Sequence, residues 1–305
     1  MHNAEKTELG SSADFKISVV VPCYNAEKTL ADTLTSIASQ QWNEPWEVIV
    51  ADNRSTDGSW RLAESFRDRF TQFRIISANE GQGTPFAINR GVHEARGRSV
   101  VFCDADDVPA TGWLAAMGNA LEQHEFVACR MDFSSLNPVE IIRQKKRGGQ
   151  TSGLMQISYP PYLPHAGGST LGIRREIFLK LGGYDPSFVY LHETDFCFKA
   201  QLDGHELHFV PDAVLAVRLR RDYTATFKQA FHWAEYNVRL AKRYKSYGEP
   251  PKRCWIRLWR DTARIATQLV SWSRVSEQQK MNMAWQSGTQ LGKIKGVIKY
   301  RAAPY

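Results

Sequence analysis

Residues 17–25 read I-S-V-V-V-P-C-Y-N and residues 46–59 read W-E-V-I-V-A-D-N-R-S-T-D-G-S, two apolar β-branched runs that end in polar residues. A helical pattern follows each apolar run. Four such pairs occur: Ile17–Val21 with a helix from about Lys28, Trp46–Ala51 with one from about Ser59, Arg74–Ser77 with one from about Thr84, and Ser99–Phe102 with one from about Thr111. Strands separated by helices of this length form parallel βαβ units, so the sequence predicts an α/β fold with a mainly parallel sheet flanked by helices.

Polar and turn-forming residues follow all four predicted strands. They are Pro22-Cys23-Tyr24-Asn25, Asp52-Asn53-Arg54-Ser55, Asn79-Glu80-Gly81 and Asp104-Ala105-Asp106-Asp107. Ligands of such sheets bind where the carboxyl ends of the parallel strands meet. We therefore expect these four segments to form one polar rim and to carry the chemistry of the protein.

The last part of the chain differs from the rest in charge and composition. Residues 218–305 hold 19 Lys and Arg against 5 Asp and Glu, whereas residues 1–217 hold 20 against 27. Helix-forming residues with Trp and Arg replace the β-branched runs there, and they predict helices at about Thr224–Tyr247, Cys254–Trp272 and Glu277–Lys299. We predict three parts: a disordered lead at 1–14, an α/β catalytic domain at 15–221 and a basic helical extension at 222–305.

Cysteine usage and hydropathy favour a cytoplasmic protein. The five cysteines are scattered without metal-ligand spacing, which predicts buried, reduced thiols. The amino-terminal residues lack the apolar core of a signal peptide, and no window approaches the roughly 20 apolar residues that span a bilayer.

The segment D-A-D-D at 104–107 is the strongest chemical signal. Three carboxylates within four residues, directly after an apolar strand, repel each other unless a cation lies among them. Oxygen ligands of this kind suit Mg²⁺ or Mn²⁺, which also bind substrate phosphates. An ordinary acidic turn is the alternative interpretation, since Asp favours turns, but the position after a fourth strand favours a divalent cation.

Seven segments in order resemble the large family of inverting family 2 glycosyltransferases with the GT-A fold. They are V-V-V-P-C-Y-N at 19–25, V-I-V-A-D-N-R-S-T-D-G-S at 48–59, N-E-G at 79–81 with A-I-N-R-G at 87–91, F-C-D-A-D-D at 102–107, G-G-S-T-L-G-I-R-R-E-I-F at 167–178, L-G-G-Y-D at 181–185 and H-E-T-D-F-C-F-K-A-Q-L-D-G-H at 192–205. The resemblance covers about residues 15–220, and the ordered set is far more specific than any one segment.

The resemblance implies a nucleoside-diphosphate-sugar donor, with UDP-sugars favoured, and an acceptor hydroxyl in glycan, polysaccharide or glycolipid synthesis. It places Asp106 as the metal ligand that bridges to the diphosphate, with Asp104 on the ribose or the metal. The implied donor-binding residues are Pro22, Tyr24, Asn25, Asp52, Ser55, Asn79, Gly81 and Asp104. A divalent cation in this position would neutralise the charge that grows on the departing diphosphate.

The family also places a catalytic carboxylate at the start of a helix, in a segment that commonly reads Glu-Asp-x-Asp. This chain has His192-Glu193-Thr194-Asp195 there. We expect Glu193 to be the general base that takes the acceptor proton, with Asp195 as the alternative. Both carboxylates could instead serve only to complement the dipole of the helix that they begin.

A second departure from the family lies near residue 216, where many relatives have a His and this chain has Ala216. Arg218, Arg220 or Arg221 is therefore expected to hold the diphosphate, because a guanidinium matches phosphate geometry. Residues 130–170 are expected to bind the acceptor. Within them, 145–149 and 159–164 are rich in Gly, Pro and charge, which predicts a mobile lid.

Two interpretations of the helical extension remain open. Its Trp residues among Arg and Lys are typical of a contact with anionic lipids on the inner face of the cell membrane, or with a lipid-linked acceptor. Helices that pack on the catalytic domain with their basic faces in water explain the same pattern. No nucleic-acid-binding motif accompanies the charge, so no such partner is expected. The alternative function is a catalytically silent scaffold that binds nucleotide sugars.

Overall fold

The computed structural model describes residues 15–144, 149–249, 253–269 and 275–305. The predicted disordered lead at 1–14 and residues 145–148 of the predicted lid lie outside the described residues. In the described part, the chain forms an eight-stranded sheet in the order β3-β2-β1-β4-β7-β6-β8-β5. The strands are β1 Ile17–Cys23, β2 Trp46–Asp52, β3 Phe73–Ser77, β4 Ser99–Phe102, β5 Val108–Pro109, β6 Phe126–Asp132, β7 Leu171–Arg174 and β8 Leu207–Ala216.

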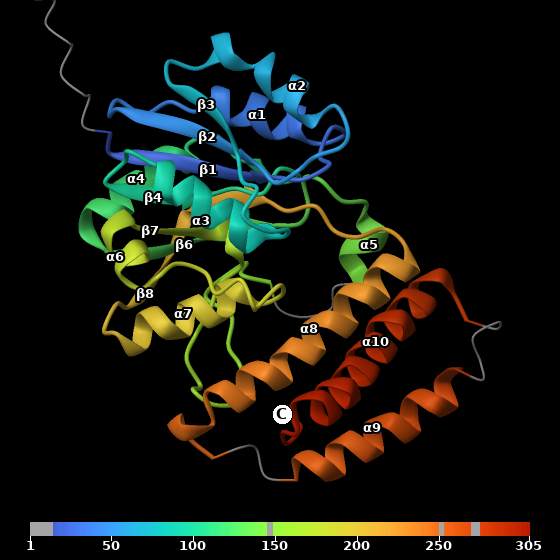
Figure 1. Cartoon of the computed structure of the whole chain (residues 1–305). Coiled ribbons are helices and arrows are strands. Elements are labelled where there is room, and N and C mark those ends of the chain that lie inside the picture. Colours follow the sequence, from blue (N-terminus) through green and yellow to red (C-terminus); the bar gives the residue numbers. More distant parts are fainter. Residues whose placement is uncertain (1–14, 145–148, 250–252, 270–274) are drawn as a thin grey trace, which may run out of the picture.

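Helices cover both faces of this sheet and continue beyond it (Figure 1). They are α1 Leu30–Ala38, α2 Ser59–Glu64, α3 Thr84–Glu94, α4 Trp113–Gln123, α5 Val139–Gln144, α6 Arg175–Lys180, α7 His192–Leu202, α8 Tyr223–Arg243, α9 Cys254–Leu269 and α10 Glu277–Tyr300. Short 3₁₀ helices lie at η1 Arg67–Arg69, η2 Gly168–Thr170 and η3 Lys245–Tyr247.

The first half of the fold follows the predicted βαβ pattern. Strands β3, β2, β1 and β4 are parallel neighbours, and each begins within one residue of its predicted start. Strands β7 and β6 then run antiparallel to their neighbours on the β4 side, so the sheet is mixed. This arrangement confirms the predicted α/β class with a mainly parallel sheet.

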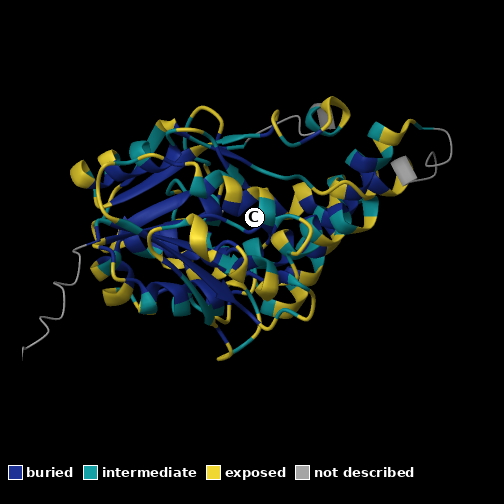
Figure 2. Cartoon of the chain, turned by 90° about the horizontal axis from the view of Figure 1, so that it is seen from above, coloured by how far each residue is buried: buried dark blue, intermediate teal, exposed yellow. Residues whose placement is uncertain are grey.

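Alternation along the central strands explains why both faces of the sheet are buried. In β1, Val19 and Val21 pack under α1, α2 and α4, whereas Val20 lies on the opposite face with α3, α6 and α7. A strand covered on both faces needs apolar residues at every position, which is why β1 and β2 read as continuous apolar runs. Figure 2 shows the buried sheet between its exposed outer helices.

The carboxyl-terminal helices lie where the sequence predicts them. Helix α10 lies between α8 and α9 and packs against both (Figure 1). Its contact with α8 is close enough to require glycine, since a Cβ atom at Gly292 would lie 2.0 Å from the carbonyl oxygen of Phe231. The buried carboxylate of Glu235 on α8 forms ion pairs with Lys295 at 2.8 Å and Lys299 at 2.6 Å.

The predicted lid is wrong for residues 159–164. The Tyr159 side chain is buried, and it packs with Phe188, Leu240 and Tyr244 in a cluster that joins this segment to α8. Its hydroxyl also donates to Asn237 on α8. Gly and Pro content indicates an irregular backbone, but it does not reveal that Tyr159 would find a partner on a distant helix.

The five cysteines are free and buried, as predicted. Burial and the nearby Asp52 carboxylate raise the pKa of the Cys23 thiol to about 11, so this thiol stays protonated near neutral pH. Among the described residues, none of the helices is both long enough and apolar enough to cross a bilayer.

Candidate functional site

The predicted polar rim exists at the carboxyl ends of three adjacent strands, β2, β1 and β4. Cys23 at the end of β1 pairs in register with Asp52 at the end of β2. On the other side, the Cys103 amide that follows β4 donates to the Val20 carbonyl at 3.2 Å. The segments that begin at Pro22, Asp52 and Asp104 therefore leave the sheet side by side.

The Asp52 carboxylate is buried at this rim, and only part of it has a partner. Its Oδ2 atom accepts the Ser55 amide at 3.2 Å, whereas Oδ1 is buried without a hydrogen-bond partner among the described residues. A buried carboxylate oxygen with an unused lone pair is costly unless a ligand donates to it. Tyr24 is half exposed nearby on the rim.

Asn25 and Ser55 join the loops after β1 and β2 to each other. The Asn25 backbone amide donates to Ser55 Oγ at 3.0 Å, and Asn25 Oδ1 accepts the Thr56 backbone amide at 2.8 Å. Asn25 has a φ of +48°, in the left-handed region that Asn tolerates better than most residues. Asn25 and Ser55, which are predicted to bind the sugar donor, therefore shape the rim through these hydrogen bonds.

Asn53, which no sequence motif marks as a site residue, organises the next loop. Asn53 Nδ2 donates to the carbonyls of Ala78 at 2.6 Å and Gly81 at 2.7 Å, and its Oδ1 accepts the Gly83 amide at 2.7 Å. Gly81 leaves no room for a side chain, since a Cβ there would lie 2.3 Å from the Phe86 ring. The exposed Asn79 side chain is thus carried on a loop that Asn53 holds in shape.

The acidic cluster of Asp104, Asp106 and Asp107 forms as predicted. Carboxylate oxygens of the three residues lie within 4.8 Å of one another. Burial and the charges of Asp107, Asp106 and Glu193 hold the pKa of Asp104 well above its usual range. Burial and the Asp106 charge raise the pKa of Asp107 to about 7. Clustered carboxylates of this kind suit a divalent cation, since a positive charge among them would remove the repulsion.

Arg218 follows the end of strand β8 and supports the acidic cluster. Its amide donates to Asp107 Oδ1 at 3.2 Å, its Nε donates to the Asp106 carbonyl at 3.1 Å, and its guanidinium contacts Asp32 at 3.2 Å. The Arg220 charge partly offsets the rise in the pKa of Asp104, and Arg220 has no ion pair within the part of the chain that the structure describes. Arg220 therefore offers the less engaged guanidinium of the two.

Glu193 lies on the side of α7 that faces the cluster. Its side chain is partly exposed, and Gly168 of η2 packs against its Cβ. The neighbouring Ser169 of η2 hydrogen-bonds to Asp107, so η2 links the cluster to Glu193. Leu191, just before α7, has a φ of +57°, an unusual conformation for Leu that is typical of functional sites.

Asp195 has a different environment from Glu193, since residues two apart on a helix point about 200° apart. Asp195 is 1% exposed. Its Oδ1 accepts the Tyr244 hydroxyl at 2.9 Å, and its Oδ2 lies 3.4 Å from Arg243. Burial raises its pKa in spite of the Arg243 charge. Asp195 thus ties α7 to the carboxyl-terminal end of α8.

His192 stands where the family commonly has an acidic residue. It is buried against the Tyr184 ring at a centroid distance of 4.9 Å, and burial lowers its pKa. Its Nε2 lies 3.6 Å from Glu193 Oε2. Because a neutral imidazole replaces the acidic residue at position 192, Glu193 has no carboxylate as its preceding neighbour. His165 is also buried, and burial lowers its pKa to about 4.

Tyr244→Phe tests the link between α7 and α8. Removing the hydroxyl leaves a buried carboxylate oxygen without its closest donor, so we expect the free energy of unfolding to fall by about 1–3 kcal/mol. Tyr247→Phe, at an exposed site three residues later, is the matched control. Urea unfolding of both variants measures the difference, and an equal loss in the two would contradict the assigned contact.

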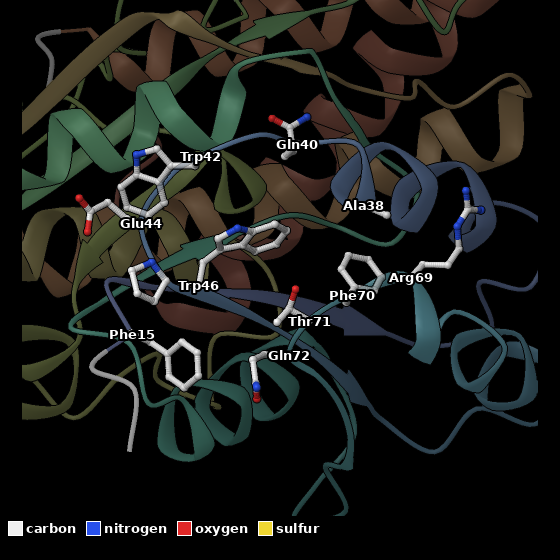
Figure 3. Close-up of a pocket in the computed structure, with 11 residues that line it drawn as sticks. Phe15, Ala38, Gln40, Trp42, Glu44, Trp46, Arg69, Phe70, Thr71 and Gln72 are labelled. Atoms are coloured by element: carbon white, nitrogen blue, oxygen red, sulfur yellow. The ribbon is translucent and has the colours of Figure 1, made fainter. Parts of the chain in front are cut away.

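A cavity lies away from this rim. It has a volume of about 440 Å³ and is lined by Trp42, Trp46 and Phe70, among others (Figure 3). Trp46 is the first residue of β2, so this cavity opens at the amino ends of the parallel strands, opposite the rim that carries Asp52. The candidate site on the rim is therefore separate from this cavity.

The comparisons with known proteins agree with this geometry. The family model described as Glycosyl transferase family 2 matches residues 18–182. The chain is 27% identical over 184 residues to "UDP-Glc:alpha-D-GlcNAc-diphosphoundecaprenol beta-1,3-glucosyltransferase WfgD" of Escherichia coli, a match covering 60% of this chain and 68% of that protein. It is 36% identical over 115 residues to the uncharacterized glycosyltransferase YfnE of Bacillus subtilis, covering 37% of this chain and 29% of YfnE.

Solved structures share the fold over most of the chain. The mannosyltransferase PcManGT from Pyrobaculum calidifontis, in complex with GDP-Man and Mn²⁺, has a TM-score of 0.62 at 20% identity, covering 94% of this chain and 88% of that one. S. aureus TarS 1-349 in complex with UDP-GlcNAc has a TM-score of 0.52 at 17% identity, covering 94% and 92%. The predicted GT-A fold is confirmed. Because the family model covers more than half of its length, the chain belongs to glycosyl transferase family 2.

Proposed function

We propose that this chain transfers a sugar from a nucleoside-diphosphate sugar to an acceptor hydroxyl, with inversion and with the help of a divalent cation. The observation that carries the proposal is the acidic cluster with its raised pKa values, close to Glu193 on the same rim as Asp52. The name of WfgD includes UDP-Glc, and PcManGT and TarS were solved in complex with GDP-Man and UDP-GlcNAc, which supports a nucleotide-sugar donor and favours UDP.

The nucleoside end of the donor is assigned to the rim at β1 and β2. The free Oδ1 of Asp52 would accept an N–H of the base, and this contact supplies the missing partner of a buried oxygen. The half-exposed Tyr24 ring and Pro22 would bound the base and ribose. Asn79 and Gly81 would contact the nucleotide from the loop that Asn53 organises.

The diphosphate end is assigned to the acidic cluster. Asp106 and Asp104 would hold a divalent cation, which would neutralise negative charge on the departing nucleoside diphosphate. PcManGT was solved with Mn²⁺, which supports a cation here. Arg220 would contact the diphosphate directly, whereas Arg218 would contribute by holding the turn at Asp106 and Asp107.

Glu193 is assigned as the general base. It would take the proton of the acceptor hydroxyl while the hydroxyl oxygen bonds to the anomeric carbon and the bond from that carbon to the diphosphate oxygen breaks. Attack opposite the leaving group inverts the anomeric configuration. The full burial of Asp195 and its contacts with Tyr244 and Arg243 support Glu193 over Asp195 for this role.

We assign the reaction to polysaccharide or glycolipid synthesis. Its acceptor would be a lipid-linked molecule at the inner face of the cell membrane. WfgD, whose name includes a diphosphoundecaprenol acceptor, supports this assignment. The basic extension supports a position at an anionic surface, since residues 218–305 hold 19 Lys and Arg against 5 Asp and Glu.

A thermal-shift screen of the full chain tests the proposed function. UDP-, GDP-, dTDP- and CMP-sugars are each measured with and without Mn²⁺ or Mg²⁺, because a ligand that binds only the folded state raises the melting temperature. We expect one donor class, a UDP-sugar, to stabilise the protein only when the cation is present. Absence of a shift with every donor would contradict the proposed function.

A further inference from the structure

Helix α9 exposes large apolar side chains to solvent. Trp255, Ile256 and Trp259 are 48%, 63% and 68% exposed, respectively. The opposite side of the same helix is buried through Leu258 and Ile265, and it packs on α10. Helix α9 is therefore apolar on two sides, and only one of them has a partner within the described residues.

The exposed apolar side chains form a continuous stripe. At about 100° per residue, Trp255, Trp259 and Ile256 fall within roughly 100° of one another around the helix axis. The exposed Ala263 and Ala266 lie in the same sector. These residues make up the outer face of α9: Trp255, Ile256, Trp259, Ala263 and Ala266.

Basic side chains flank the outer face along one side. Arg257, Arg260 and Arg264 follow it within about the next 100° of the helix circumference. Their exposed positions leave the guanidinium groups in solvent, and side chains of Arg260 and Arg264 are 71% and 59% exposed. The nearby acidic group is Asp261, which lies 3.4 Å from Arg260 and 3.9 Å from Arg264 and offsets one of the three charges.

We propose that the outer face of α9 lies on the surface of an anionic lipid bilayer. The Trp and Ile side chains would enter the headgroup region, where the amphipathic indole ring is favoured, and the three arginines would contact lipid phosphates. The excess of Lys and Arg in residues 218–305 favours an anionic lipid surface over a second copy of this basic segment, which would repel it. This membrane contact rests on the proposed function in one respect only: it would bring the rim to a lipid-linked acceptor.

Vesicle co-sedimentation of the full chain tests the proposal. The probes are vesicles of phosphatidylcholine alone and of phosphatidylcholine mixed with phosphatidylglycerol. We expect binding to the mixed vesicles that weakens with salt, since exposed charges are screened within about 10 Å at 0.1 M ionic strength. Trp255→Ser with Trp259→Ser should reduce partitioning by about tenfold or more, because indole anchors are lost.

Charge reversal should have a larger effect. Each basic residue near an anionic surface contributes roughly fivefold to partitioning, so Arg260→Glu with Arg264→Glu should reduce binding by at least roughly 25-fold. Trp60→Ser and Arg61→Glu are matched controls, because both residues are exposed on α2, a helix that follows β2 and lies outside the carboxyl-terminal extension. The controls should bind vesicles like the unchanged chain, and all variants should keep its melting temperature.

Equal vesicle binding by the outer-face variants and the controls would overturn the proposal. So would a dimer in size-exclusion chromatography that the Trp255→Ser, Trp259→Ser variant loses, since the face would then join two copies of the chain. The metal-dependent donor shift of the same variants should remain unchanged. If the unchanged chain binds vesicles but shows no metal-dependent donor shift, the proposed function is contradicted and the membrane contact is not.

Discussion

Asp106→Asn is expected to remove the metal-dependent part of donor binding and to leave the fold intact. The substitution keeps the shape of the side chain but removes a carboxylate from the cluster that lies within 4.8 Å. A cation in such a site stabilises charge by several kcal/mol, so the affinity for UDP in Mn²⁺ should fall by roughly a hundredfold or more. Isothermal titration of UDP with and without Mn²⁺ measures the change.

The metal-free protein provides a second measure of the same variant. Burial, together with repulsion from Asp107 and Asp106, raises the pKa of Asp104, and the Asn variant carries one charge less. Its melting temperature without metal should therefore be no lower than that of the unchanged chain. Asp68→Asn, at an exposed site in η1, is the matched control and should leave nucleotide binding unaltered. Unchanged Mn²⁺-dependent affinity in Asp106→Asn would remove the metal assignment.

Glu193→Gln is expected to lower turnover by roughly 10²–10⁴-fold while the donor affinity stays the same. Gln fills the same space beside Gly168 but cannot take a proton from the acceptor hydroxyl. The donor is assigned to contacts with other residues, so its binding should not depend on this carboxylate. Steady-state kinetics with saturating donor, together with a donor titration, separate the two quantities.

Glu176→Gln, at an exposed site in the first turn of α6, is the control for this experiment. It should leave turnover and donor affinity unaltered. Near-normal turnover in Glu193→Gln would instead assign the proton transfer to Asp195. That outcome would require Asp195 to exchange its contacts with Tyr244 and Arg243 for the acceptor, which a structure with bound acceptor would reveal.

The sequence predicts the sheet half of this fold well because its signals are local. Each parallel strand is a continuous apolar run, and each is followed by a helical pattern and a polar turn. Burial of β1 on both faces is the physical reason for such a run, and the acidic cluster follows β4 at the expected edge. The helices of the extension are equally local, and α8 and α10 begin within one residue of their predicted starts.

Contacts between distant segments could not be predicted in this way. Tyr244 is 49 residues from Asp195, and no pattern at either position indicates the pair. Tyr159 lies 78 residues from Asn237, so a segment that reads as a loop is packed against a helix. Asn53 could have been noticed, since it is a polar residue directly after a buried strand, but its three loop partners are visible only in the fold.

The contact of Asp195 with Arg243 and Tyr244 has a consequence for how the chain unfolds. Removing the carboxyl-terminal helices would leave a buried carboxylate without its donors inside α7, and it would uncover the cluster of Phe188, Phe198 and Tyr159. We therefore expect the sheet and the extension to unfold as one cooperative unit, and calorimetry should record a single melting transition. A truncation after residue 222 would lose more than a surface anchor, because the helix that carries Glu193 would lose its support.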